Sequence, residues 1–197
     1  IVPIAEECGV IEELGLLSFR QACRMAQRWP DLSVAVNLSP LNFQNAKLAA
    51  VVAETLAANG LPPETLMLEI TEGVLIEDFD RGLALLRRLK ALGVRISMDD
   101  FGTGYSSLSY LQAFPFDKIK IDQSFVRDID TSVENQAIVR AVISLARDLG
   151  MRVTAQGVEN EQQATILAGL GCTEVQGFLY SRPIPSSEIE KVEADTR

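Results

Sequence analysis

The sequence predicts an α/β fold in which parallel strands form a TIM-like β/α barrel. Short runs rich in β-branched residues alternate along the chain with helical patterns, which implies right-handed crossovers between parallel strands. Each run has one aliphatic face, and its opposite face becomes polar toward the carboxyl end. A barrel of this type builds its active site at that end, from residues of several strands.

The strands are expected in six segments, at residues 32–39, 66–71, 95–100, 118–122, 152–158 and 174–180. The main helices are expected at residues 11–29, 44–59, 78–92, 133–149 and 160–170. The connection 101–117 is expected to be mostly turn, with one short helix around the letters SSLSYLQ. The links LPPETL and LGVR contain the Pro and Gly residues that stop and restart helices.

The faces of the strands follow the two-residue period of an extended chain. The aliphatic face holds Val34, Val36, Leu38, Leu66, Leu68, Ile70, Ile96, Met98, Ile119, Ile121, Val153 and Ala155. The polar positions near the carboxyl ends are Asn37, Glu69, Asp99, Lys120, Gln156 and Gln176. The alternative is an open doubly wound sheet, but strands covered by helices on both faces tend to be apolar throughout. The pattern therefore favours the barrel.

Composition and charge limit the classes of function. A chain of 197 residues is expected to form a single domain with a substantial core. The net charge of −9 argues against binding to a nucleic-acid backbone. No apolar run is long enough to span a membrane, and the start IVPIAEECGVIEELG carries acids where a leader peptide would be basic. We expect a cytoplasmic domain without membrane contact of its own, although it can be the cytoplasmic part of a larger membrane-attached protein.

The chain contains no histidine, which excludes His-based triads, His general bases and His-rich zinc sites within it. Any metal must be held by oxygen, which favours Mg²⁺ or Mn²⁺. The cysteines Cys8, Cys23 and Cys172 lie far apart and form no CxxC pair. They are expected to be buried free thiols in a reducing compartment.

Asp99 and Asp100 end one strand with adjacent carboxylates, which repel each other unless a cation lies between them. Each polar residue alone has an ordinary explanation. Asn37 could cap a turn, and Glu69 could pair with an arginine. Asp99 or Asp100 could bond the amides of the next loop, and Lys120 could be a solvated strand residue. The same feature on six strands instead favours one shared site.

Such a site suits phosphate chemistry. An amide oxygen with several carboxylates forms a hard oxygen site for Mg²⁺ or Mn²⁺. Two such ions about 3.5–4 Å apart activate water for in-line attack on phosphorus, and Lys120 could orient that water or offset the developing charge. The glycines of DDFGTGYSS permit a tight turn, but the spacing is not that of a P-loop. The sequence therefore predicts metal-assisted phosphodiester hydrolysis.

Four segments carry a family resemblance: VAVNLSPLNF, LMLEITEGVLIED, ISMDDFGTGYSSLSYLQAFPFDKIKIDQSFV and GVENEQQATILAGLGCTEVQGFLYSRPIP. They resemble the EAL domain family of cyclic di-GMP phosphodiesterases, which act in bacterial signalling, and the match runs through nearly the whole chain. The resemblance implies a TIM-like barrel that binds cyclic di-GMP and opens one of its two phosphodiester bonds to give linear pGpG. It also implies two Mg²⁺ or Mn²⁺ ions.

The resemblance assigns a role to each matching residue. Asn37, Glu69 and Asp99 resemble ligands of the first metal, and Asp99 would bridge to the second, which Asp100 also binds. Lys120 matches the lysine that contacts the catalytic water, and Gln176 matches a glutamine near the guanine end of the pocket. Glu72 resembles the glutamate that braces the glycine loop, and Glu159 a supporting acid. A homodimer through the 101–113 loop region and attached or partner sensory or GGDEF domains are also implied.

The chain departs from the family pattern in two ways. The Glu-Ala-Leu motif is missing, and IVPIAEECGV resembles the helix that follows it. Residues 1–197 are therefore expected to form one EAL-type barrel domain that lacks the N-terminal strand or strands, including the EAL strand. The segment TAQGVE has Gln156 where the family pattern AEGVE has a glutamate that binds the second metal and is a candidate general base.

Gln156 leaves two functional hypotheses open. A glutamine can offer a metal one oxygen, but it carries no charge and cannot take a proton from water. The first hypothesis is a phosphodiesterase impaired by Gln156 and by the missing EAL glutamate, and the retained carboxylates favour it. The second is a catalytically degenerate cyclic di-GMP receptor, which Gln156 favours. An interaction scaffold that binds no nucleotide is a third.

Overall fold

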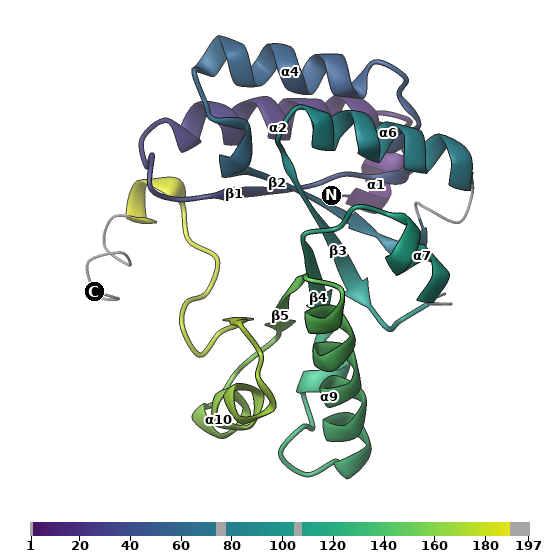
Figure 1. The fold of residues 1–197 in the computed structure, drawn as a ribbon. Helices are drawn as coiled ribbons and strands as arrows, with labels where there is room; N and C mark the ends of the chain where they lie inside the picture. Colours follow the sequence, from purple (N-terminus) through teal and green to yellow (C-terminus); the bar gives the residue numbers. More distant parts are fainter. Residues whose placement is uncertain (1, 74–77, 105–107, 190–197) are drawn as a thin grey trace. The chain divides into compact units, whose positions relative to one another are not determined.

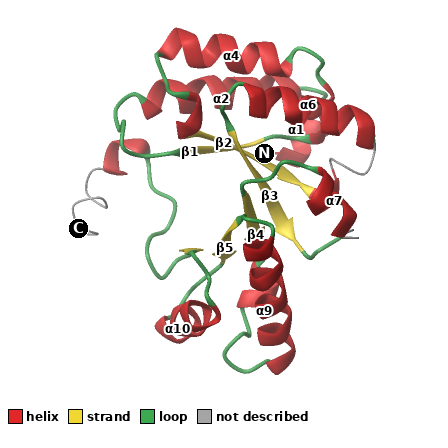
Figure 2. Cartoon of the chain, in the orientation of Figure 1, coloured by secondary structure: helices red, strands yellow, loops and turns green. Residues whose placement is uncertain are grey.

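The structure is a computed structural model that describes residues 2–73, 78–104 and 108–189. The chain divides into two compact units, residues 1–117 and 118–197. Each unit carries three parallel strands with helices between them, as Figures 1 and 2 show. In each unit the strands pair in chain order, without the reversal that marks a doubly wound sheet.

The first unit contains a three-stranded sheet and the helices that pack on it. Its strands are β1 (Val34–Asn37), β2 (Leu66–Thr71) and β3 (Arg95–Phe101). Its helices are α1 (Val2–Glu7), α2 (Ile11–Ala26), α3 (Pro40–Gln44), α4 (Leu48–Asn59), the 3₁₀ turn η1 (Pro63–Thr65), α6 (Phe79–Ala91) and α7 (Leu108–Ala113). Helix α2 packs on β1, α6 packs on β3, and α4 contacts both helices.

The core of the first unit is the aliphatic face predicted for its strands. Leu66, Leu68 and Ile70 of β2 are almost fully buried, as are Ile96 and Met98 of β3. The register places Leu68 beside Ile96 and Ile70 beside Met98, so that these side chains form continuous layers under the helices. The aliphatic face predicted from the two-residue period is confirmed here.

The second unit repeats the arrangement. Its strands are β4 (Lys118–Ile121), β5 (Arg152–Gln156) and β6 (Glu174–Gln176). Its helices are α8 (Gln123–Val126), α9 (Val133–Asp148), α10 (Glu161–Leu170) and the 3₁₀ turn η2 (Ser186–Glu188). Helix α9 packs on β4 and β5, where Ile119, Ile121, Val153 and Ala155 are at most 2% exposed.

Side-chain caps explain where several helices begin. Ser39 and Asn160 form capping boxes at α3 and α10, and Asp78 and Ser132 accept amide hydrogen bonds at the starts of α6 and α9. Each cap pairs a backbone amide that the helix itself leaves free. The predicted helix 44–59 begins at Leu48 instead, because the capped helix α3 occupies residues 40–44.

Three predicted strands are clearly too long, and the first of them, predicted at 32–39, is shortened at both ends to Val34–Asn37. Strand β5 ends at Gln156 rather than at residue 158, because Gly157 has a φ of +74° that an extended strand cannot contain. Strand β6 ends at Gln176 rather than at residue 180, because the chain then turns: the Tyr180 amide donates to the Gly177 carbonyl at 3.1 Å. The ends of β5 and β6 both depend on local backbone geometry, which the spacing of apolar residues does not reveal.

The thiols differ in exposure. Cys23 is buried and Cys172 is half-buried, whereas Cys8 is exposed. The expectation of buried thiols is therefore wrong for Cys8, which lies in the turn after α1, although all three cysteines are free. Burial raises the pKa of Cys23 to about 11 and also raises the pKa of Cys172. In the described part of the chain no helix combines the length and apolarity needed to cross a membrane.

Candidate functional site

The first unit brings three predicted site residues onto one face of its sheet. Asn37 and Glu69 are direct partners in the β1–β2 register. In the β2–β3 register Glu69 is the partner of Ser97, and Thr71 is the partner of Asp99. Partners in parallel strands point to the same face and lie about 4.8 Å apart. Asn37 and Glu69 therefore form one row across the sheet, and Asp99 lies in the next row toward the carboxyl ends.

Asn37 is exposed, but the two carboxylates beside it are not simply solvated. Glu69 is 8% exposed and Asp99 is 7% exposed, although their carboxylates face away from the aliphatic layer. Burying a carboxylate is unfavourable unless hydrogen bonds or a cation compensate. One compensation is visible, because the Asp100 amide donates to Oδ1 of Asp99 at 3.1 Å. This donor lies within strand β3, so it is not one of the loop amides that the ordinary explanation for Asp99 named.

Asp100 has an unusual backbone. Its φ is +53°, the only positive φ of a non-glycine residue in the described ranges. The Thr103 hydroxyl donates to its carbonyl at 2.9 Å, and Gly102, with a φ of +97°, continues the turn. Alternation along a strand would send the side chains of Asp99 and Asp100 to opposite faces, but this backbone departs from extended geometry. Strain of this kind costs about 1–3 kcal/mol and concentrates at functional sites.

Ser97 is a site candidate that sequence reasoning missed. It is fully buried, and its hydroxyl has no hydrogen-bond partner within residues 2–73, 78–104 and 108–189. It lies beside Glu69 in the register and two residues before Asp99 on the same face. A buried hydroxyl without a partner is costly unless a water or ligand satisfies it. The alternation of RISMDD was the available signal, because it places Ser97 and Asp99 on one face.

Glu72 lies against the glycine loop, where the resemblance places it. A Cβ atom added to Gly104 would come within 2.8 Å of its Oε2 atom, so the loop approaches this carboxylate too closely for a side chain at position 104. The Oε2 atom is buried and has no hydrogen-bond partner among the described residues. The adjoining residues 105–107, which belong to the loop expected to form a dimer, lie outside the described residues.

The second unit brings its own predicted residues together. Gln156 and Gln176 are direct partners at the carboxyl ends of β5 and β6. Lys120 is the partner of Thr154, one row nearer the amino ends, on the same face. Lys120 is only 5% exposed, so the alternative of a solvated strand lysine is wrong. Glu159 lies beyond β5, where its side chain is exposed and its amide donates to Oε1 of Gln163 at 2.8 Å.

The candidate ligand atoms are of the type that a hard divalent cation binds. In the first unit they are all oxygens, two of them on buried carboxylates beside the buried Ser97 hydroxyl. Within the described ranges no three His, Cys, Asp or Glu side chains are grouped closely enough to hold a metal ion. The predicted set contains three such side chains, Glu69, Asp99 and Asp100, and the described chain does not draw them into a group of this kind. The metal centre stays a prediction.

The fold and these polar rows define an α/β domain with polar side chains at the carboxyl ends of its parallel strands. The EAL domain model matches residues 1–183, and the chain belongs to the EAL domain family. An uncharacterized signaling protein of Caulobacter vibrioides is 55% identical over 185 residues, 93% of this chain and 23% of that protein. The bifunctional diguanylate cyclase/cyclic di-GMP phosphodiesterase MucR of Pseudomonas aeruginosa is 42% identical over 193 residues, 95% of this chain and 28% of MucR. The chain thus spans about a quarter of the length of these curated relatives.

Solved structures confirm the predicted fold class. The cyclic di-GMP complex of the PaMucR phosphodiesterase matches with a TM-score of 0.91 and 41% identity, over 96% of this chain and 78% of that one. The manganese and cyclic di-GMP complex of Klebsiella pneumoniae BlrP1 matches with a TM-score of 0.84 and 37% identity, over 89% of this chain and 46% of that one. The chain therefore has the α/β, TIM-barrel-like fold of EAL domains.

Proposed function

We propose that this chain is a cyclic di-GMP phosphodiesterase domain that hydrolyses cyclic di-GMP to linear pGpG with Mg²⁺ or Mn²⁺. The observation that carries the proposal is the row of Asn37 and Glu69 followed by Asp99 and the strained Asp100 at one edge of three parallel strands. The PaMucR complex with cyclic di-GMP and the BlrP1 complex with manganese and the same nucleotide support it.

The proposed metal ligands are Asn37, Glu69, Asp99, Asp100 and Gln156. Divalent ions at such a site polarise a phosphate and lower the pKa of bound water. The chain's own residues have separate tasks. Lys120 is a buried ammonium with three N–H donors, and it would orient the attacking water. Gln176, exposed at the end of β6, would offer its amide to a guanine edge. Glu159 would act as a supporting acid.

Gln156 is the residue that determines how fast hydrolysis is expected to be. It is half-buried and adjacent to Gln176, so it lies at the proposed substrate end of the row. Its amide can donate hydrogen bonds and offer one oxygen, but it cannot accept a proton from water. We therefore infer a slow enzyme. The second candidate function is a receptor that binds cyclic di-GMP without hydrolysis, and the same residue favours it.

The whole protein's partners are also proposals. MucR combines the two named activities in one chain, and the present chain covers 28% of it. A linked or partner GGDEF or sensory domain would therefore supply or respond to the nucleotide. A homodimer through the 101–113 region and a cytoplasmic location complete the proposal.

The test separates three outcomes in the 197-residue chain. Calorimetry with cyclic di-GMP and Ca²⁺ or Mg²⁺ measures binding, and chromatography of pGpG with Mn²⁺ measures turnover. We expect binding, slow turnover, and an increase of roughly 10²-fold or more in Gln156→Glu, because a general base contributes that much. The matched control is Gln162→Glu, the same change at an exposed position of α10.

Each alternative has its own result. A parent without detectable turnover, together with an active Gln156→Glu variant, would establish the receptor. Equal activity of parent and variant would contradict the role given to position 156. Absence of any binding heat would leave only the interaction scaffold.

A further inference from the structure

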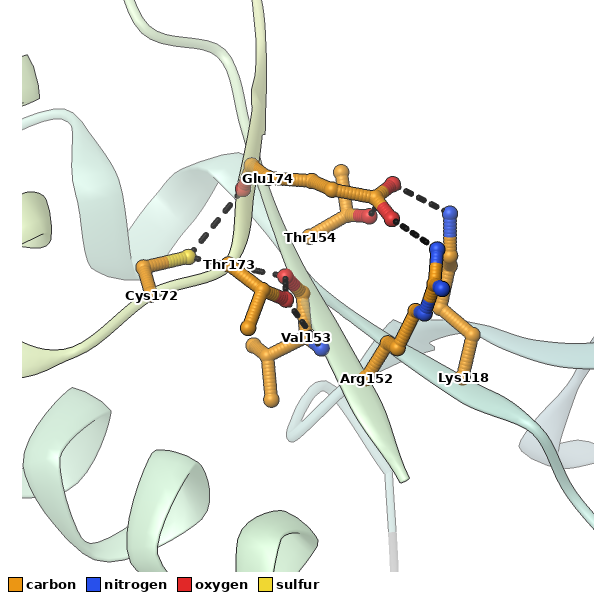
Figure 3. A network of polar contacts seen from close by, with 7 residues as sticks. All are labelled: Lys118, Arg152, Val153, Thr154, Cys172, Thr173 and Glu174. Carbon is orange, nitrogen blue, oxygen red and sulfur yellow. Dashed lines mark hydrogen bonds and ion pairs between the residues drawn. The ribbon is translucent and has the colours of Figure 1, made fainter. Parts of the chain in front are cut away.

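Glu174 joins a network of polar contacts at the amino-terminal ends of β4, β5 and β6, which the proposed reaction does not use (Figure 3). Its carboxylate accepts a hydrogen bond from the Lys118 ammonium and forms an ion pair with it. Nη1 of Arg152 lies 3.5 Å from Oε1, and the Thr154 hydroxyl donates to Oε2 at 3.1 Å. One glutamate thus ties the short strand β6 to both other strands of its unit, β5 beside it and β4 beyond.

The two residues before Glu174 strengthen this attachment to β5. The Val153 amide donates to Oγ1 of Thr173 at 3.0 Å, and the same hydroxyl donates to the Val153 carbonyl at 2.7 Å. The Cys172 thiol contacts β5 through the Val153 carbonyl at 3.7 Å, and it also lies 3.1 Å from the Glu174 carbonyl. Figure 3 shows these contacts together with those of the Glu174 carboxylate. Residues 172–174 and their partners are named the β6 anchor.

The β6 anchor and the proposed site share one face of the sheet. Glu174 is two residues from Gln176 on a strand of three residues, so both side chains point to the same face. The neighbouring strand β5 has the same arrangement: Thr154 is the partner of Glu174, and Gln156 is the partner of Gln176. A shift of Glu174 along or away from β5 would therefore displace Gln176.

Beyond Gln176 the chain is held a second time. The Val158 amide donates to the Gln176 carbonyl at 3.1 Å, and the Leu179 amide donates to the Val158 carbonyl at 3.0 Å. Gln176 lies between this backbone attachment and the β6 anchor. The anchor depends on charge: the Lys118 side chain is 16% exposed and that of Glu174 is 35% exposed. Charge-assisted hydrogen bonds that are partly shielded from solvent are stronger and shorter than neutral ones.

We propose that Glu174 is a positioning residue, whose charge fixes β6 so that Gln176 stays beside Gln156 for binding cyclic di-GMP. The proposal rests on the proposed function for the identity of the ligand. Glu174 does not contact the ligand. It affects binding by holding β6, the strand that carries Gln176.

The main test replaces Glu174 by Gln, which keeps the shape and removes the charge. Hydrogen exchange of the 172–180 peptide is expected to become roughly tenfold faster in Glu174→Gln, and the affinity for cyclic di-GMP with Ca²⁺ is expected to fall by a similar factor. Exchange in α9 is expected to stay unchanged. The matched control Asp148→Asn removes one exposed carboxylate at the end of α9 and is expected to resemble the parent.

A charge swap distinguishes positioning from a general loss of stability. The double variant Lys118→Glu with Glu174→Lys restores an ion pair but places the new ammonium beside Arg152, so it is expected to recover part of the slow exchange at 172–180 and part of the affinity relative to Glu174→Gln. Unchanged exchange in Glu174→Gln, or a rise shared equally by α9 and α10, would overturn the proposal. If the parent binds no cyclic di-GMP, the proposed function fails, and the exchange comparison with the charge swap still decides whether Glu174 fixes β6.

Discussion

Asp100 has a strained backbone and is also a proposed metal ligand. Its left-handed φ of +53° is unfavourable for any residue with a side chain, although Asp and Asn tolerate it best. A structural role alone would not require an aspartate, because a glycine would fit the same turn with less strain. Asp100 is therefore expected to be retained for its carboxylate.

Asp100→Gly tests this expectation. The variant is expected to keep or raise the free energy of unfolding, by up to about 1 kcal/mol, because strain is removed, and to lose at least roughly tenfold in Mn²⁺ affinity. Urea denaturation and calorimetry with Mn²⁺ measure the two quantities. Asp100→Asn keeps an oxygen and a tolerated backbone, so an intermediate affinity is expected. A glycine variant that binds Mn²⁺ like the parent would remove Asp100 from the metal site.

The thiols give a second prediction at this scale. The exposed Cys8 is expected to react rapidly with a thiol reagent in the native protein at pH 8. Cys23 is expected to stay unreactive, because burial raises its pKa to about 11 and leaves little thiolate. Peptide mapping after brief labelling measures each site, and labelling in denaturant supplies the control. Early modification of Cys23 would show that α2 opens readily.

Individual residues also show how far sequence reasoning reaches. The two-residue period correctly placed Glu69 and Asp99 opposite the aliphatic layer. It could not reveal that Lys120 is buried or that the Ser97 hydroxyl lacks a partner in the described ranges, because both depend on what surrounds a strand. The backbone of Asp100 was equally hidden, since Asp is compatible with several turn geometries.

Among the elements, β6 is the most dependent on contacts outside itself. It has three residues, and its end is set by a turn whose amides and carbonyls pair with Val158. The sequence pattern predicted a strand that continues to residue 180, because the residues EVQGFLY have high strand propensity by themselves. The strand ends in a local turn, and that turn is held by Val158, which lies in the loop between β5 and α10. A local pattern carries no information about this second contact.

Gly177 is the residue that makes this turn possible. A Cβ atom at position 177 would lie 2.0 Å from the carbonyl oxygen of Val158, a backbone atom that cannot rotate away. Gly177→Ala is therefore expected to lower the free energy of unfolding by about 3 kcal/mol or more, since overpacking against backbone forces a shift. Thermal and urea denaturation measure the loss.

A matched glycine in the same unit supplies the control. Gly169 lies in α10, and no atom lies within 4 Å of the Cβ that alanine would add. Gly169→Ala is expected to leave stability unchanged or to raise it by up to about 1 kcal/mol, because alanine favours a helix. If the two alanine variants have equal stability, the close approach at Val158 does not constrain β6.

At the scale of the whole molecule, the rhythm of strands and helices predicted the fold class, and the solved EAL structures confirm it. The division at residue 117 was not predicted. Asp117 ends the first unit, where it accepts from the Ile96 amide at 2.7 Å and pairs with Lys90 at 2.6 Å. These contacts join residues more than twenty positions apart, so no periodic pattern marks them.

Acid stability provides a test that involves the whole chain. Burial of the Glu174 carboxyl raises its pKa, but the hydrogen bond and charge of Lys118, the Thr154 hydroxyl and the charge of Arg152 together hold this pKa below its ordinary value of 4.5. A group whose pKa is lower in the folded state stabilises that state above the unfolded pKa. Below it, the unfolded chain binds more protons, so this stabilisation is lost as the pH falls through the folded pKa.

Glu174→Gln should therefore be less stable than the parent near neutral pH, and the difference should shrink as the pH falls below about 4.5. Urea denaturation of both proteins between about pH 3 and 7 measures this difference directly. Lys118→Gln removes the partner with the largest favourable effect, so its pH profile should approach that of Glu174→Gln. The other carboxylates titrate in all three proteins, so their contribution cancels in the comparison to the extent that sites are independent. A difference that stays constant across this range would show that Glu174 contributes through packing rather than through charge, and the electrostatic account of the β6 anchor would then be wrong.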